Sequence, residues 1–240
     1  MTRFILFLVG VMYVYSLYSQ DLSQKTDNMF KNGTGNLVSM YDSVINHEKS
    51  FISGEQHTFN VKSGNYPFLI NEWLPGYVNF EGRYFKVDNL RYDVNKDALI
   101  TNALYEGTKK IIQLNCYSVK GFIIDERFFQ HLDSQNTNKR KLSEGYYELL
   151  YDGKNKLYKK WTCYFRKSNS LEKGEFVFKS DLYIKNSSGD LYEIRNKHSF
   201  IKLIQNENKE IKEFIRISKI KFYPDKENGI KKVLERLDET

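Results

Sequence analysis

The chain carries few side chains of the kinds that bind metals or transfer protons. Its histidines are the first candidates for both roles, and they are His47, His57, His131 and His198. A metal centre or a general base needs several such groups to converge. His47-Glu48 and His131-x-Asp133 come nearest to this, and neither has a recognised ligand spacing. The sequence also lacks the motifs of serine hydrolases, zinc peptidases and nucleotide-binding loops. We therefore expect no catalytic residues, no metal and no cofactor, and we favour a protein that is not an enzyme.

The two cysteines, Cys116 and Cys163, are the next candidates. Both occupy apolar positions of predicted strands, so they could meet in the core and form a disulfide in an oxidising compartment. Such a bridge would close a long loop and stabilise the fold by about 4 kcal/mol on the chain-entropy model. The alternative is two buried free thiols that pack as small hydrophobic side chains.

Aromatic side chains crowd one segment of the chain and could bind a ligand. The candidates are Trp73, Tyr77, Tyr84 and Tyr92. Stacked aromatic rings on a sheet can hold a sugar ring or a lipid tail. The same residues more often form the core and the cross-strand pairs of a sheet. Both interpretations stay open at this point.

The first residues of the chain have the pattern of a secretory signal. Arg3 is followed by an apolar run from Phe4 to Tyr15, which is shorter than the roughly 20 residues that a membrane-spanning helix needs. Small Ser19 then precedes a polar stretch and is the expected cleavage site. We predict a signal peptide over 1–19 and a periplasmic or secreted protein, with an uncleaved anchor as the alternative. No transmembrane segment is expected after removal of the signal.

Charge narrows the choice of partner. The net charge of the 240 residues is +7, which by itself suggests an anionic partner. The charged residues are mixed in sign along the chain, however, and an exported protein seldom meets DNA. We therefore predict no nucleic-acid partner, and expect instead an unknown envelope protein, a surface or a lipid.

Periodicity predicts the elements that must position these residues. A polar, flexible tether over 20–36 precedes a single β-rich domain over 37–240. Apolar and polar residues alternate along its strands, as where Leu157, Trp161 and Cys163 share one parity while Tyr158 and Lys160 share the other. Pairs ending in glycine separate these strands and suit tight turns. The fold class is mainly β: an antiparallel meander forming a curved sheet, a sandwich or a barrel-like structure.

The period changes near the C-terminus, where two α-helices are predicted over about 206–238. The first runs from Glu207 to Ile220 and the second from about Lys226 to Asp238, and Ser199 to Gln205 could add a helical turn. The second helix has an apolar stripe consisting of Ile230, Val233, Leu234 and Leu237. We expect this stripe to pack on the sheet. The alternative is a helix that binds a partner.

Four short motifs carry a resemblance to a known family. They are Gly76-Tyr77-Val78, Glu81-Gly82-Arg83-Tyr84, Leu90-Arg91-Tyr92-Asp93 and Tyr147-Glu148-Leu149-Leu150-Tyr151-Asp152-Gly153. With them the chain resembles an uncharacterised exported β-rich protein family of Bacteroidetes, chiefly flavobacterial, to which no activity is assigned. The resemblance implies an envelope location and supplies no catalytic residues.

The expected function follows from export and from the lack of a catalytic motif. We predict an envelope or secreted protein that binds another protein or a surface. The alternative is a carrier that holds a hydrophobic or lipid ligand in its curved sheet.

Overall fold

The computed structural model describes residues 54–58, 65–105, 108–133, 136–137, 140–141, 143–167, 174–204 and 211–239. All of them belong to one compact unit, His47–Thr240. The predicted signal, its cleavage site after Ser19 and the predicted tether lie outside the described residues.

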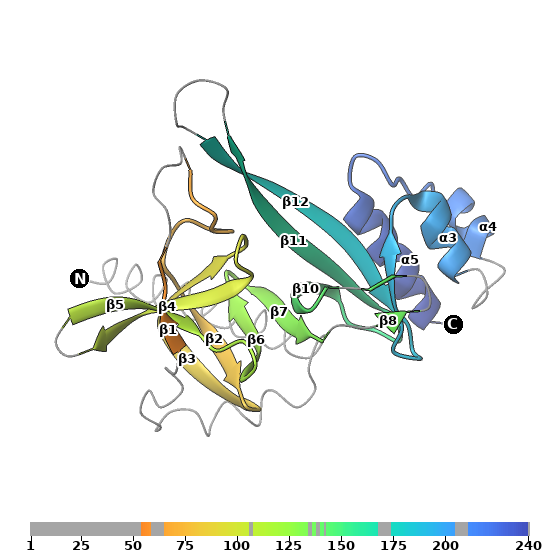
Figure 1. Ribbon diagram of the computed structural model, residues 1–240. Coiled ribbons are helices and arrows are strands. Elements are labelled where there is room, and N and C mark those ends of the chain that lie inside the picture. Colours follow the sequence, from red (N-terminus) through yellow and green to blue (C-terminus); the bar gives the residue numbers. More distant parts are fainter. Residues whose placement is uncertain are drawn as a thin grey trace, which may run out of the picture. The chain divides into compact units, whose positions relative to one another are not determined.

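The described part is mainly β, as predicted (Figure 1). Eleven strands form one sheet in which every neighbouring pair is antiparallel. In chain order they are β1 (Gly54–Gln56), β2 (Leu74–Phe80), β3 (Arg83–Asp93), β4 (Ala98–Tyr105), β5 (Thr108–Leu114), β6 (Val119–Ile124), β7 (Arg127–Leu132), β10 (Gly145–Tyr151), β11 (Lys156–Lys167), β12 (Gly174–Lys185) and β13 (Leu191–Ile194). Two short strands, β8 (Asn136–Thr137) and β9 (Arg140–Lys141), pair separately between β7 and β10. The order across the main sheet is β1-β5-β4-β3-β2-β6-β7-β10-β11-β12-β13.

Two of the glycine-ending pairs form turns between strands. Glu81 and Gly82 have φ angles of 50° and 84° between β2 and β3, and Gly189 has a φ of 89° between β12 and β13. Turns with positive φ match the twist of antiparallel strands, and glycine adopts them without a Cβ clash. These turns give the meander its short connections.

The sheet is strongly curved, as the short connection between β5 and β6 requires. Three strands separate β5 from β6, which would place them about 19 Å apart in a flat sheet. Residues 115–118 alone connect the two, and the N–H of Ser118 donates to the Asn115 carbonyl at 3.2 Å. A turn of that kind spans less than about 7 Å. The sheet must therefore bend back on itself, yet β5 pairs with β1 and β4 and not with β6, so it stays open. Of the predicted alternatives, the structure has the curved sheet.

The long β11–β12 hairpin lies against the curved part. Cys163 pairs with Phe178 in its register, and the predicted parity of β11 is confirmed. Both residues pack with the core cluster that β2, β3, β6 and β7 build. Two asparagine side chains fasten the hairpin edges: Asn95 Nδ2 donates to the Cys163 carbonyl at 2.9 Å, and Asn65 bonds to both backbone groups of Phe176.

Three helices, rather than the predicted two, lie near the C-terminus: α3 (Lys197–Ile204), α4 (Ile211–Ile217) and α5 (Lys226–Asp238). The extra helix α3 grows from the predicted helical turn because Asn196 caps it. The N–H of Ser199 donates to Asn196 Oδ1 at 2.8 Å, and the N–H of Asn196 donates to Ser199 Oγ at 3.1 Å. The first predicted helix, Glu207 to Ile220, corresponds to α4, and its predicted start at Glu207 lies outside the described residues. None of the described helices is both long enough and apolar enough to span a bilayer.

The apolar stripe of α5 packs on the sheet, as expected. Ile230, Val233, Leu234 and Leu237 are all buried, in a cluster with Leu157 of β11 and with side chains of β12, β13, α3 and α4. The far end of the helix is tied down as well, because Tyr151 Oη donates to Asp238 Oδ2 at 2.7 Å. Packing against the sheet, rather than helix propensity, therefore holds α5 in place.

We expect Leu234→Ala to lower the free energy of unfolding by about 2–5 kcal/mol, because it leaves a cavity beneath α5. Lys232→Ala, on the exposed face of the same helix, should change it by less than about 0.5 kcal/mol. Urea denaturation followed by circular dichroism measures both. Equal, small effects would restore the alternative that this helix binds a partner.

Candidate functional site

The four aromatic residues predicted to bind a ligand do not share one face of the sheet. Between Leu74 and Gly76 of β2, the partner strand β3 contains one extra residue. Such a bulge moves every later side chain to the opposite face. Tyr84 and Tyr92 have the same parity in the sequence, but the bulge places them on opposite faces.

Each of these aromatic residues has its own surroundings. Tyr92 is buried in the core, which is the other role considered for it. Tyr77 and Tyr84 are half-buried on the opposite face of β2 and β3. Trp73 packs against the guanidinium of Arg91, whose Cζ lies 4.3 Å from the ring centroid. The structure thus separates Tyr92 from Tyr77 and Tyr84, which stay together on the opposite face.

Aromatic rings fill the interior of the curved sheet. Phe122 and Phe129 stack with their centroids 4.7 Å apart, and Tyr92 lies 5.3 Å from each of them. The Tyr146 ring meets Phe122 edge-on at 5.0 Å. Burial raises the pKa of Tyr92 and of Tyr146, so both phenols stay neutral and act as hydrogen-bond donors.

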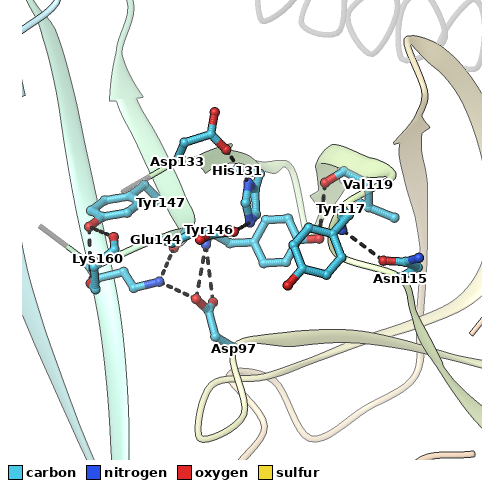
Figure 2. A network of polar contacts seen from close by, with 11 residues as sticks. Asp97, Asn115, Tyr117, Val119, His131, Asp133, Glu144, Tyr146, Tyr147 and Lys160 are labelled. Carbon is cyan, nitrogen blue, oxygen red and sulfur yellow. Dashed lines mark hydrogen bonds and ion pairs between the residues drawn. The ribbon is translucent and has the colours of Figure 1, made fainter. Parts of the chain in front are cut away.

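A polar network centred on Asp97 lies beside these rings (Figure 2). Asp97 closes the turn between β3 and β4 in the left-handed region, with a φ of 52°. Its carboxylate accepts a short hydrogen bond from Tyr92 Oη and one from the N–H of Tyr146, which is 3.3 Å from each oxygen. Lys160 Nζ completes the set at 2.6 Å from Oδ2. A Cβ on Gly145 would overlap the carboxylate, so glycine is required there.

Lys160 is 5% exposed, and its ammonium is fully occupied. Besides Asp97, it donates to the Tyr146 carbonyl at 3.0 Å and lies 4.8 Å from the centroid of the Tyr147 ring. A lysine held in this way has a positioning role, because it joins β11 to β10 and to the β3–β4 turn.

A buried histidine–aspartate pair joins the strands around β1. His57 Nε2 lies 3.1 Å from Asp93 Oδ2, and His57 Nδ1 lies 3.2 Å from Gln113 Oε1. The other oxygen of Asp93 accepts the N–H groups of Asn95 and Lys96. A histidine–aspartate pair serves as a general base when one ring nitrogen faces the substrate. Here both nitrogens face protein groups, so the pair fastens the residue after β1 to β3 and β5.

A third histidine lies among carboxylates at the end of β7 (Figure 2). His131 Nδ1 is 3.7 Å from Asp133 Oδ1, and His131 Nε2 is 3.7 Å from Glu144 Oε1. One ligand atom from each residue lies within 4.8 Å of the others, close enough to hold a metal ion. The His131 side chain is 6% exposed, whereas Asp133 and Glu144 are 92% and 47% exposed.

The sequence pattern His131-x-Asp133 was noted without a recognised ligand spacing, and Glu144 was missed. Two signals could have found the set. Residues two apart on a strand share a face, and a hairpin-like return brings Glu144 opposite Asp133. The second signal depends on the register between β7 and β10, which the sequence between them does not fix.

Both cysteines are free thiols in the structure. They pack against the same core cluster, with Cys163 buried and Cys116 half-buried. Burial raises the pKa of the Cys163 thiol to about 11, which disfavours the reactive thiolate. Of the two alternatives for these residues, the structure has the unbridged one.

The outer half of the hairpin leaves a strand edge unpaired. Phe176 directs its N–H and C=O away from β11, toward Asn65, and residues at alternate positions do the same. Phe178 and Ser180 therefore also face outward, and β13 covers this edge only from Leu182 onward. No residue in the described part of the chain pairs with their outward backbone groups. We call Phe178–Ser180 the open edge.

Free thiols give a direct prediction. Protein that is unfolded in denaturant without reduction should take up two alkyl groups, as read from the intact mass. In the folded protein, Cys116 should react before Cys163, because the Cys163 thiol is buried and kept protonated. Uptake of no alkyl group after unfolding would show a bridge instead.

The Lys160–Asp97 ion pair leads to a prediction about stability. Lys160→Met should lower the free energy of unfolding by about 2–4 kcal/mol, because Asp97 loses its charged partner in a mostly buried site. With Asp97→Asn added, the double variant should cost less than the two single variants together. Arg166→Met breaks the exposed pair with Glu175 and should cost less than about 1 kcal/mol. Additive losses in urea denaturation would contradict the coupling.

Comparisons with protein-family models, with curated proteins and with solved structures found no match to this chain. Its own side chains must therefore carry any functional conclusion. The described part offers a partner two features: the group around His131, which could hold a metal ion, and the open edge of β12.

Proposed function

We propose that this chain is an exported protein that is cleaved after Ser19 and binds a partner protein, in the periplasm or after secretion. The proposal agrees with the resemblance to the exported Bacteroidetes family, of which we propose it is a member. The observation that carries the binding role is the open edge of β12. A row of outward N–H and C=O groups is best satisfied by another extended backbone, so the partner supplies an extended segment.

Side chains beside the open edge suit a protein interface. Tyr164 and Phe165 are 42% and 40% exposed on the neighbouring strand β11. Aromatic residues are enriched where proteins bind one another. Lys179 Nζ lies 5.0 Å from the centroid of the Tyr164 ring and places a charge in the middle of the edge. Such a charge discourages pairing between copies of the chain, while a matched partner can still add a strand.

The electrostatics of this region favour a protein over a nucleic acid. At the end of the hairpin Arg166 is paired with Glu175, and Asp181 follows Lys179 closely in β12. Basic residues with acidic residues so close to them do not form the continuous positive surface that binds a phosphate backbone.

The alternative function, a carrier of a hydrophobic ligand, has less support. A carrier needs a large apolar cavity inside its curved sheet. In this chain the rings of Tyr92, Phe122, Phe129 and Tyr146 pack against one another at that position. The interior is thus occupied by the protein's own side chains, and we favour binding at the surface.

Site-specific photocrosslinking in the native host tests the proposal. A photoreactive amino acid in place of Tyr164 should give one discrete protein adduct, and the same group in place of exposed Lys232 on α5 should give none. Ser180→Pro removes an outward N–H but no bond to β11, so it should reduce the adduct by about tenfold or more. Ser180→Ala keeps that N–H and should leave the adduct unchanged.

The same material reports on export. The chain in the adduct should begin at Gln20, the residue after the expected cleavage site. An intact chain in the cytosol would contradict export, whereas an adduct that survives Ser180→Pro would contradict binding at the open edge.

A further inference from the structure

We propose that His131, Asp133 and Glu144 bind one divalent transition-metal ion of the zinc class, with water completing its coordination. The site lies at the junction of β7 and β10, apart from the open edge, and does not depend on the binding function proposed above.

Strand register places two carboxylates opposite each other. His131 pairs with Tyr146 and Leu132 with Gly145, so the next position along places Asp133 opposite Glu144. Like charges that face each other across two strands repel and destabilise the sheet. A cation between the two carboxylates converts this repulsion into attraction.

The imidazole provides a second and independent indication. The His131 side chain is 6% exposed, and its two nitrogens each lie 3.7 Å from a carboxylate oxygen, which is longer than a hydrogen bond. A polar ring that is buried without a hydrogen bond is unfavourable. A metal ion bound to one of these nitrogens would supply a partner to that nitrogen, and both carboxylates would turn toward the ion.

The protein holds the histidine rigidly and leaves the carboxylates adjustable. The Tyr146 ring packs edge-on against His131 with their centroids 5.1 Å apart, and Tyr146 Oη donates to the Val119 carbonyl at 3.3 Å. The exposed side chains of Asp133 and Glu144 can move inward from the present separation of up to 4.8 Å. Bonds of about 2.0–2.2 Å to zinc need only that small movement.

Donor chemistry indicates which ion fits. One imidazole nitrogen with two carboxylate oxygens suits Zn²⁺ and its neighbours, whereas Ca²⁺ and Mg²⁺ prefer more oxygen ligands. Three protein ligands leave at least one coordination position to water, and two of the three side chains are exposed. The site is therefore open to solvent and exchangeable, unlike a closed structural zinc site.

Zinc titration of the untagged full chain by calorimetry tests the site. We expect one Zn²⁺ per chain, and Asp133→Asn and Glu144→Gln should each weaken binding by about tenfold or more. Asp88→Asn and His198→Ala, which change an exposed carboxylate and an exposed histidine elsewhere, should leave binding unchanged. A thousandfold excess of Mg²⁺ should not displace the zinc.

Thermal unfolding provides a second test, because the difference in Tm between Asp133→Asn and the wild type should change sign when zinc is added. Without metal, Asp133→Asn should raise Tm by a degree or two, because it removes the repulsion. With saturating Zn²⁺, the wild-type Tm should rise while that of the variant stays unchanged. The proposal is overturned if 100 µM Zn²⁺ does not bind, if His198→Ala abolishes binding, or if neither carboxylate variant weakens it. It is also overturned if Asp133→Asn lowers the Tm of the metal-free protein, since the two carboxylates would then not repel each other.

Discussion

Lys160 and Asp97 form a largely buried ion pair that joins the β3–β4 turn to β11, beside the backbone pairing of β7 with β10. The charge of Lys160 is removed from water, so it must be compensated by a nearby anion. Asp97 provides that anion from the turn between β3 and β4, and it also accepts bonds from Tyr92 and from the backbone of Tyr146. The β3–β4 turn of the curved meander thereby contacts both β10 and β11 through one carboxylate. No other residue fits in place of Gly145 beside it, because any side chain would occupy the space of the carboxylate.

This constraint determines where the residues of the proposed metal site lie. Tyr146 is held by Asp97 through its backbone and by Val119 through its hydroxyl, so its ring is fixed from both ends. His131 packs edge-on against that ring, which holds the imidazole in place. Asp133 and Glu144, one residue beyond the described ends of β7 and β10, are free of this restraint. The imidazole is therefore rigid and the two carboxylates are adjustable because the pairing of β7 with β10 ends at Leu132 and Gly145, between the two kinds of residue.

The sequence predicted the features that depend on local pattern. The parity of β11, the turn at Glu81-Gly82 and the α5 helix over Lys226–Asp238 were all confirmed, because each depends on periodicity or turn chemistry within a few residues. Features that depend on pairing between distant strands were missed. The bulge in β3 separated Tyr84 from Tyr92, and only the β7–β10 register brings Glu144 to Asp133. Neither the bulge nor the register can be recognised from the sequence of a single strand.

At each of the two places proposed to bind something, the described part of the chain leaves polar groups without a matching partner. Other polar side chains near the core are paired, as at His57 with Asp93 and at Arg127 with Glu148. At the end of β7, like charges face each other beside an imidazole without a hydrogen bond. Along the open edge, no strand in the described part of the chain pairs with the outward backbone groups, although Asn65 covers the neighbouring position at Phe176. Both features are explained if a cation and a partner strand supply the missing interactions.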